Sequence, residues 1–115
     1  MGINSNNEYY YTYHPLVLKK DIPRLDSGTL DRIRYSIENK LIINPTIYGS
    51  PLHGVLRGYW KLRVGDYRVI YSIIKSEIRV FIIGHRKDVY DFVLIVPPEL
   101  PAFSDAGMNG GGREW

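Results

Sequence analysis

The fold is decided by residues 53–90, which read HGVLRGYWKLRVGDYRVIYSIIKSEIRVFIIGHRKDVY. Within this stretch, residues 59–64 alternate strictly between two kinds of side chain, which is typical of a β-strand. The apolar set expected on one face is Trp60, Leu62 and Val64. The set expected on the opposite face is Tyr59, Lys61 and Arg63.

Two short turns connect this strand to two more. Gly65-Asp66 makes the first turn, after which residues 67–74 are expected to return as a largely buried strand. Lys75-Ser76 then turns the chain into a third strand over residues 77–83. Because gaps this short cannot hold a crossover connection, the three strands are predicted to form an antiparallel meander.

Positive charge is concentrated in this meander. Between residues 54 and 90, eight Lys and Arg residues stand against three acids, a balance of +5, whereas the whole chain carries +3. A basic sheet of this kind indicates a polyanionic partner, either a nucleic acid or an acidic protein segment.

The residues before the meander predict one strand and two helices. Four tyrosines and a threonine favour a strand over residues 8–14, which Pro15 ends. A short helix is expected over residues 16–24, with Pro23 at its end or just beyond it. A longer helix follows it, and its apolar residues recur at helical spacing: Leu30, Ile33, Ile37 and Leu41.

The ends of this longer helix are marked by polar residues and by proline. The side chains that can cap its first turn are Asp26, Ser27 or Thr29. The helix is predicted to stop before Asn44-Pro45, because a residue that precedes proline is pushed out of helical geometry. Residues 47–54 are rich in turn-forming residues and lead into the meander.

Length and composition indicate one domain. The chain has 115 residues and a mass of 13.3 kDa, with 44% hydrophobic and 23% charged residues. We expect a frayed N-terminus over residues 1–7, a domain over residues 8–92, and an extension over residues 93–115 that is flexible from about residue 105.

Several classes of protein are excluded or made improbable by what the sequence lacks. It contains no cysteine, so disulfides and thiolate metal sites are excluded. Its three histidines have no carboxylate spacing that would favour a metal site. Without a secretory signal or a long apolar run, a soluble cytoplasmic protein without a metal or small-molecule cofactor is expected.

Three sequence blocks carry a resemblance to a known family. They are Leu52-x-Gly54, residues 61–71 (KLRVGDYRVIY) and residues 84–90 (GHRKDVY). Together with the order strand, two helices and meander, they resemble the RelE/ParE toxins of type II toxin–antitoxin systems, over roughly residues 9–90. The resemblance implies an α+β fold and a cognate antitoxin as partner.

The family has two activities, and the fold alone does not choose between them. RelE-like members are ribosome-dependent endoribonucleases that cut mRNA, and this is the activity we expect here. ParE-like members inhibit DNA gyrase without nuclease activity. A catalytically decayed member that only binds its antitoxin is a third reading.

The resemblance also implies site residues. Lys61 and Arg68 match cationic positions of the family, Tyr90 matches a late tyrosine, and either His85 or Arg86 matches the next cationic group. Tyr59 stands where RelE-like enzymes carry a second lysine. Arg68 would stabilise the phosphate, Lys61 and Arg86 would assist, and His85 or Tyr90 would move protons or hold the base.

Each of these residues also has a structural alternative. Arg68 could form an ion pair with Asp66 or Asp88, and Tyr90 could simply pack on the sheet. Three further cations are expected to contact RNA phosphates: Arg57, Arg63 and Lys87. The other two histidines are expected to be structural or exposed: His14 and His53.

Overall fold

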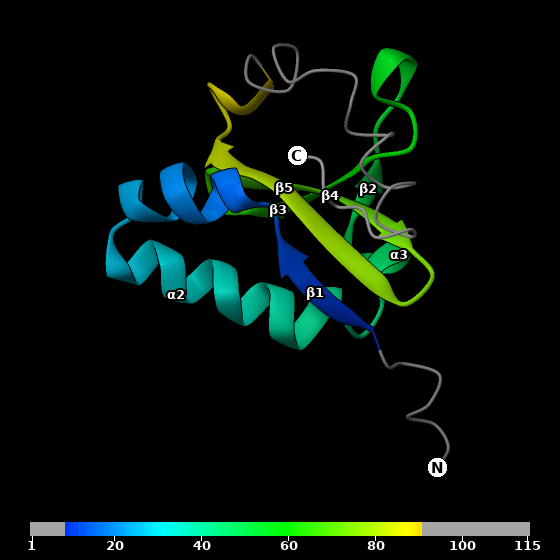
Figure 1. The fold of residues 1–115 in the computed structure, drawn as a ribbon, viewed down its shortest axis with the longest axis horizontal. Helices are drawn as coiled ribbons and strands as arrows, with labels where there is room; N and C mark the ends of the chain where they lie inside the picture. The colour runs from blue at the N-terminus through cyan, green and yellow to red at the C-terminus, as the bar shows by residue number, and fades with distance from the viewer. Residues whose placement is uncertain (1–8, 91–115) are drawn as a thin grey trace.

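The computed structural model describes residues 9–90, which form an α+β fold (Figure 1). Its five strands make one mixed sheet in the order β1-β5-β4-β3-β2. The predicted fold class is therefore confirmed. The predicted N-terminal segment 1–7 and extension 93–115 lie outside the described residues.

The antiparallel meander is confirmed. It consists of β3 (Trp60–Val64), β4 (Tyr67–Ile74) and β5 (Glu77–His85). Gly65 and Lys75 take positive φ angles of 60° and 58° in the two turns, as two-residue hairpin turns require. β5 runs two residues further than the sequence predicted, as far as His85.

Two short strands extend the meander on both sides. β1 (Tyr10–Tyr13) pairs in parallel with β5, so that Tyr10 lies opposite Glu77. β2 (Ser50–Pro51) pairs antiparallel with β3 inside the stretch predicted to be turns. β1 lies within the strand predicted over residues 8–14, whereas β2 was not predicted, since a strand of two residues depends on the edge that β3 provides.

The predicted short helix forms in two consecutive turns. These are η1 (Val17–Asp21), which is π-helical, and η2 (Ile22–Arg24), which is a 3₁₀ turn containing Pro23. The histidine before them acts as a cap, because Nδ1 of His14 accepts a hydrogen bond from the Leu16 N–H at 2.9 Å. His14 is thus structural, as expected.

The longer helix consists of α2 (Ser27–Ser36) and a final π-helical turn, η3 (Ile37–Leu41). Of the three candidate caps, Asp26 is the one used: its carboxylate accepts from the Thr29 N–H at 2.7 Å. This hydrogen bond holds the pKa of Asp26 below its ordinary value. The helix ends before Asn44-Pro45, as predicted.

The connection from this helix to the meander contains two single turns. These are α3 (Pro45–Tyr48), which begins at the proline, and η4 (Gly54–Leu56). Pro45 occupies the first helical position, where its missing N–H costs nothing. The turns bring the chain back alongside β3.

One face of the sheet is covered by the helices (Figure 1). Val17, Ile33, Ile37 and Leu41 are fully buried against the sheet. The sheet residues of the same core include Leu62, Val69, Tyr71, Ile78 and Val80. This core is the main source of apolar burial in the described domain.

The other face carries a second, smaller apolar cluster. Its buried members are Leu52, Tyr59, Ile70, Phe81, Ile82 and Val89. Two neighbours on β5 belong to it because the pairing of β4 and β5 shifts between Ile70 and Tyr71. This β-bulge inserts an extra residue, so both Phe81 and Ile82 face the second cluster.

Candidate functional site

The second face of the sheet carries two of the predicted site residues side by side. Nζ of Lys61 lies 5.9 Å from the centre of the Tyr90 ring, within the range of a cation–π interaction. Lys61 projects from β3, while Tyr90 packs against the second apolar cluster after β5 has ended. The ammonium group of Lys61 and the phenol of Tyr90 therefore lie together beside the second apolar cluster.

Arg68 lies on the same face but is held by the backbone. Its Nη1 donates to the carbonyl oxygens of Gly65 and Tyr67, both at 2.9 Å. These bonds fasten the guanidinium to the turn between β3 and β4. The alternative ion pair with Asp66 or Asp88 is not formed, and Arg68 is instead an anchor for this turn.

Arg63 lies directly opposite Arg68 in the register of β3 and β4. It is exposed, whereas Arg68 is buried. Together with Lys61, the two arginines make the face positive along the end of the sheet where β3 turns into β4. A phosphate could be bound on this surface by charge-assisted hydrogen bonds.

His85 lies on the other face of the sheet, towards the helices. Its ring packs edge-on against Tyr67, with the ring centres 5.5 Å apart. Nδ1 of His85 accepts a hydrogen bond from the Lys87 N–H at 3.1 Å. The imidazole is thus separated from Lys61 and Tyr90 by the thickness of the sheet.

Arg86 extends from the turn after β5. Its N–H donates to the Asp66 carbonyl oxygen at 2.7 Å, and its Nε lies 3.6 Å from the Asp66 carboxylate. Both side chains are more than half exposed, so this ion pair contributes little stability. Arg86 is therefore available at the surface, as are Arg57 and Lys87.

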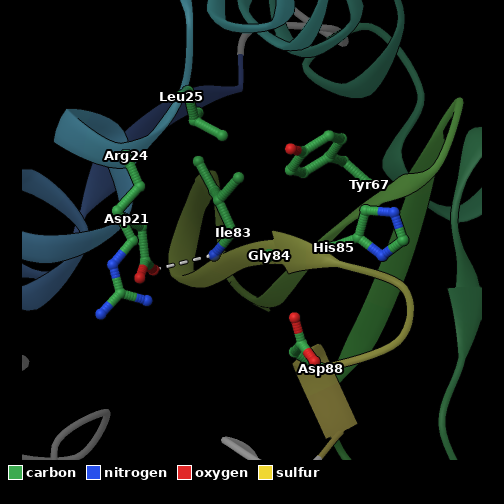
Figure 2. Close-up of a pocket in the computed structure, with 8 residues that line it drawn as sticks. All are labelled: Asp21, Arg24, Leu25, Tyr67, Ile83, Gly84, His85 and Asp88. Carbon is green, nitrogen blue, oxygen red and sulfur yellow. Dashed lines mark hydrogen bonds between the residues drawn. The ribbon is translucent and has the colours of Figure 1, made fainter.

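A pocket of about 160 Å³ opens beside His85 (Figure 2). It lies between the first helical turns and the end of β5, and we call it the η1–β5 pocket. Its lining residues are Asp21, Arg24, Leu25, Tyr67, Ile83, Gly84, His85 and Asp88. It differs from the second face in containing two carboxylates.

Asp21 is half-buried in this pocket, whereas the two other charged lining residues, Arg24 and Asp88, are exposed. Its carboxylate accepts a hydrogen bond from the Ile83 N–H at 3.0 Å. Burial raises the pKa of Asp21, while the bond from Ile83 and the positive charge of Arg24 oppose this rise. Asp21 and Arg24 were not among the predicted site residues, although their spacing of three places them on one side of a helix.

The predicted site residues are thus divided into two groups. Lys61, Arg68 and Tyr90 share the second face, while His85 lines the η1–β5 pocket and Arg86 lies at the turn between them. Among residues 9–90, no three histidine or carboxylate side chains are grouped so that they could hold a metal ion. None of the helices within that range is long and apolar enough to cross a membrane.

Comparison with known proteins identifies the family. The arrangement of two helical segments on one face of a mixed sheet with an antiparallel meander defines a small α+β domain. Residues 13–90 match the family described as ParE toxin of type II toxin–antitoxin system, parDE. The chain belongs to the RelE/ParE superfamily of type II toxin–antitoxin toxins.

Individual relatives agree with this assignment. The chain is 32% identical over 79 residues to Toxin RelE of Mycobacterium tuberculosis, covering 69% of this chain and 81% of the relative. The fold is similar to that in the toxin–antitoxin complex RelBE2 of the same organism, with a TM-score of 0.64 and 23% identity over 69% of this chain and 99% of that one. It is also similar to Escherichia coli RelE bound to an antitoxin RelB peptide, with a TM-score of 0.57 and 21% identity over 79% of this chain and 97% of that one.

Proposed function

We propose that this toxin is a ribosome-dependent endoribonuclease that cuts mRNA without a metal ion. In this reaction the 2′-hydroxyl attacks the adjacent phosphorus, a 2′,3′-cyclic phosphate forms, and the 5′-oxygen leaves with a proton. The observation that carries the proposal is the pairing of Lys61 with Tyr90 on the face that also holds Arg68.

The second face supplies the chemical groups that such a reaction needs. Arg68 and Arg63 would stabilise the negative charge that builds on the phosphate oxygens. Tyr90 would exchange a proton with a reacting oxygen, and Lys61, whose Nζ lies beside the Tyr90 ring, would contact the negatively charged phosphate. His85 and Arg86, at the end of β5, would contact the RNA on either side of the cleaved bond.

The likeness to Toxin RelE favours the nuclease, and the family match to ParE toxins favours its rival. ParE-like inhibition of DNA gyrase would need no catalytic group. The absence of a second lysine agrees with this rival, because Tyr59 stands at that position and is buried within the second apolar cluster. A cognate antitoxin is the expected protein partner, because relatives of this fold were solved as toxin–antitoxin complexes. The ribosome and mRNA in the cytoplasm would be the targets.

Mapping of mRNA 5′ ends after induction in cells tests the proposal. The wild-type chain should produce new 5′ ends in translated mRNA. Lys61→Gln and Tyr90→Phe should each reduce cleavage by about 100-fold, the lower range for a group that transfers or tunes a proton. Lys40→Gln, the same change at an exposed helix position, should cut like wild type.

Growth arrest without new 5′ ends, accompanied by DNA damage signalling, would contradict the nuclease and favour gyrase inhibition. A wild-type chain that causes no growth arrest would indicate the decayed, antitoxin-binding alternative. Normal cleavage by both variants would show that the Lys61–Tyr90 pair is only structural.

A further inference from the structure

The η1–β5 pocket has the composition of a site for a flat polar ring. Tyr67 and His85 form an aromatic side, and Leu25 and Ile83 supply apolar surface. Figure 2 shows Asp21 and Arg24 together on the side opposite these two rings, with Asp88 below. Aromatic surfaces with hydrogen-bonding groups at their margins are how proteins hold an unstacked base of RNA.

The volume of the pocket limits what can enter it. Pockets for drug-sized ligands span about 300–1,000 Å³, and the η1–β5 pocket measures about 160 Å³. It can therefore take a single ring system or one side chain, but not a complete nucleotide. The sugar and phosphate of an inserted base would remain outside, near the exposed cation of Arg86.

The charged groups of the pocket select among possible occupants. The carboxylates of Asp21 and Asp88 accept hydrogen bonds, whereas the guanidinium of Arg24 donates them. A lysine or arginine side chain from a protein could pair with the carboxylates, but it would offer Arg24 no acceptor. A base edge that presents a donor beside an acceptor satisfies both kinds of group.

We propose that the η1–β5 pocket receives one unstacked nucleobase that carries an exocyclic amino group. Adenine, cytosine and guanine each present an amino donor next to a ring acceptor or carbonyl, which matches a carboxylate beside an arginine. Uracil presents a single N3–H donor between two carbonyl oxygens, so in a pocket with two carboxylates and one guanidinium one of these oxygens would face a carboxylate. This inference rests on the proposed nuclease function and gives it a base preference within the bound RNA.

Binding of short RNA analogues tests the pocket independently of cleavage. The probes are a labelled hexauridylate and three versions with one central adenosine, cytidine or guanosine, all with 2′-O-methyl groups so that they cannot be cut. Fluorescence anisotropy with the full chain at one fixed salt concentration gives the affinities. At least one amino-bearing probe should bind about fivefold or more tightly than hexauridylate.

Two variants assign this preference to the pocket. Asp88→Asn and Arg24→Gln both alter exposed lining residues, so the fold should survive, and thermal melting checks that it does. Each should bring the affinity ratio close to one. Asp31→Asn, the matched change at an exposed position of α2, should retain the wild-type ratio.

Equal affinity of the wild-type chain for all four probes would overturn the proposal, as would a preference that survives in both variants. Loss of antitoxin binding in these variants with an unchanged probe ratio would overturn it in favour of a protein side chain as occupant. Cleavage of mRNA in cells with no probe preference would contradict base binding in the pocket and still support the nuclease. A probe preference that depends on the pocket, without any cleavage in cells, would support base binding and contradict the nuclease.

Discussion

Replacing Gly49 by alanine should disrupt the packing beneath the short strand β2. A Cβ atom at position 49 would overlap the hydroxyl oxygen of Tyr71 and lie 2.8 Å from Cζ of the same ring. The φ angle of Gly49 is −103°, which any residue can adopt. Space, rather than backbone conformation, therefore requires glycine here.

The ring of Tyr71 cannot move aside without losing other contacts. Tyr71 is fully buried, stacks on Trp60 with ring centres 6.4 Å apart, and donates a hydrogen bond to the Pro45 carbonyl at 2.8 Å. Overpacking of a core costs about 1–3 kcal/mol. A disrupted buried hydrogen bond adds about 1–2 kcal/mol, so we expect Gly49→Ala to lower the free energy of unfolding by about 3 kcal/mol.

A double-mutant cycle isolates the steric cause. Tyr71→Phe alone should cost about 1 kcal/mol, because it removes the buried hydrogen bond to the Pro45 carbonyl, which keeps its bond from the Gly49 N–H. In the double variant the hydroxyl is gone and most of the overlap with it. The combined loss should therefore be smaller than the sum of the two single losses by about 1 kcal/mol or more.

Urea denaturation followed by far-UV circular dichroism measures these free energies. Gly28→Ala is the matched control, because a Cβ there meets only Asp26 Oδ1 at 3.7 Å inside α2. That change should stabilise the protein by about 0.5–1 kcal/mol. Losses that simply add in the cycle, or a Gly49→Ala variant as stable as Gly28→Ala, would show that Tyr71 does not limit the space at Gly49.

Two further predictions concern the acid stability of the fold and the turn that Arg68 holds. Burial lowers the pKa of His14 to about 4 from its ordinary 6.5. Between these two pH values the histidine is therefore protonated in the unfolded chain and neutral in the folded chain. The free energy of unfolding should thus fall by as much as about 3 kcal/mol as the pH drops from 6.5 to 4. The variant His14→Asn can still accept the hydrogen bond from the Leu16 N–H. Its urea midpoint should therefore vary less than that of the wild type across this pH window. Arg68→Ala should lose about 2–3 kcal/mol in urea denaturation because two carbonyls lose a charged donor, and an unchanged midpoint would show that the turn does not need the arginine.

The meander and the long helix could be read from the sequence because their signals are local. Gly65-Asp66 and Lys75-Ser76 fix the turns, and β4 spans the predicted residues 67–74. The helix is bounded by Asp26 and by Pro45, which act within a few residues of themselves. In both cases the physical cause lies next to the element that it shapes.

The grouping of the candidate site residues could not be read in this way. Simple alternation along β5 would place His85 on the same face of the sheet as Arg79 and Phe81. That is the second face, which also carries Lys61 and Arg68. The extra residue of the β-bulge reverses that alternation and turns His85 towards Tyr67. Nothing in the sequence marks the bulge, because it depends on how two strands pair.

The pairing of β1 with β5 joins the two ends of the described domain, since residue 10 lies opposite residue 77. Contacts between positions so distant in sequence form late and slow the folding of a chain. During synthesis β1 has to wait until almost the entire domain has been made, and the helices have no complete sheet to cover before then. A toxin with this topology would thus leave the ribosome before its sheet is complete, and an antitoxin made alongside it would have that interval in which to capture it.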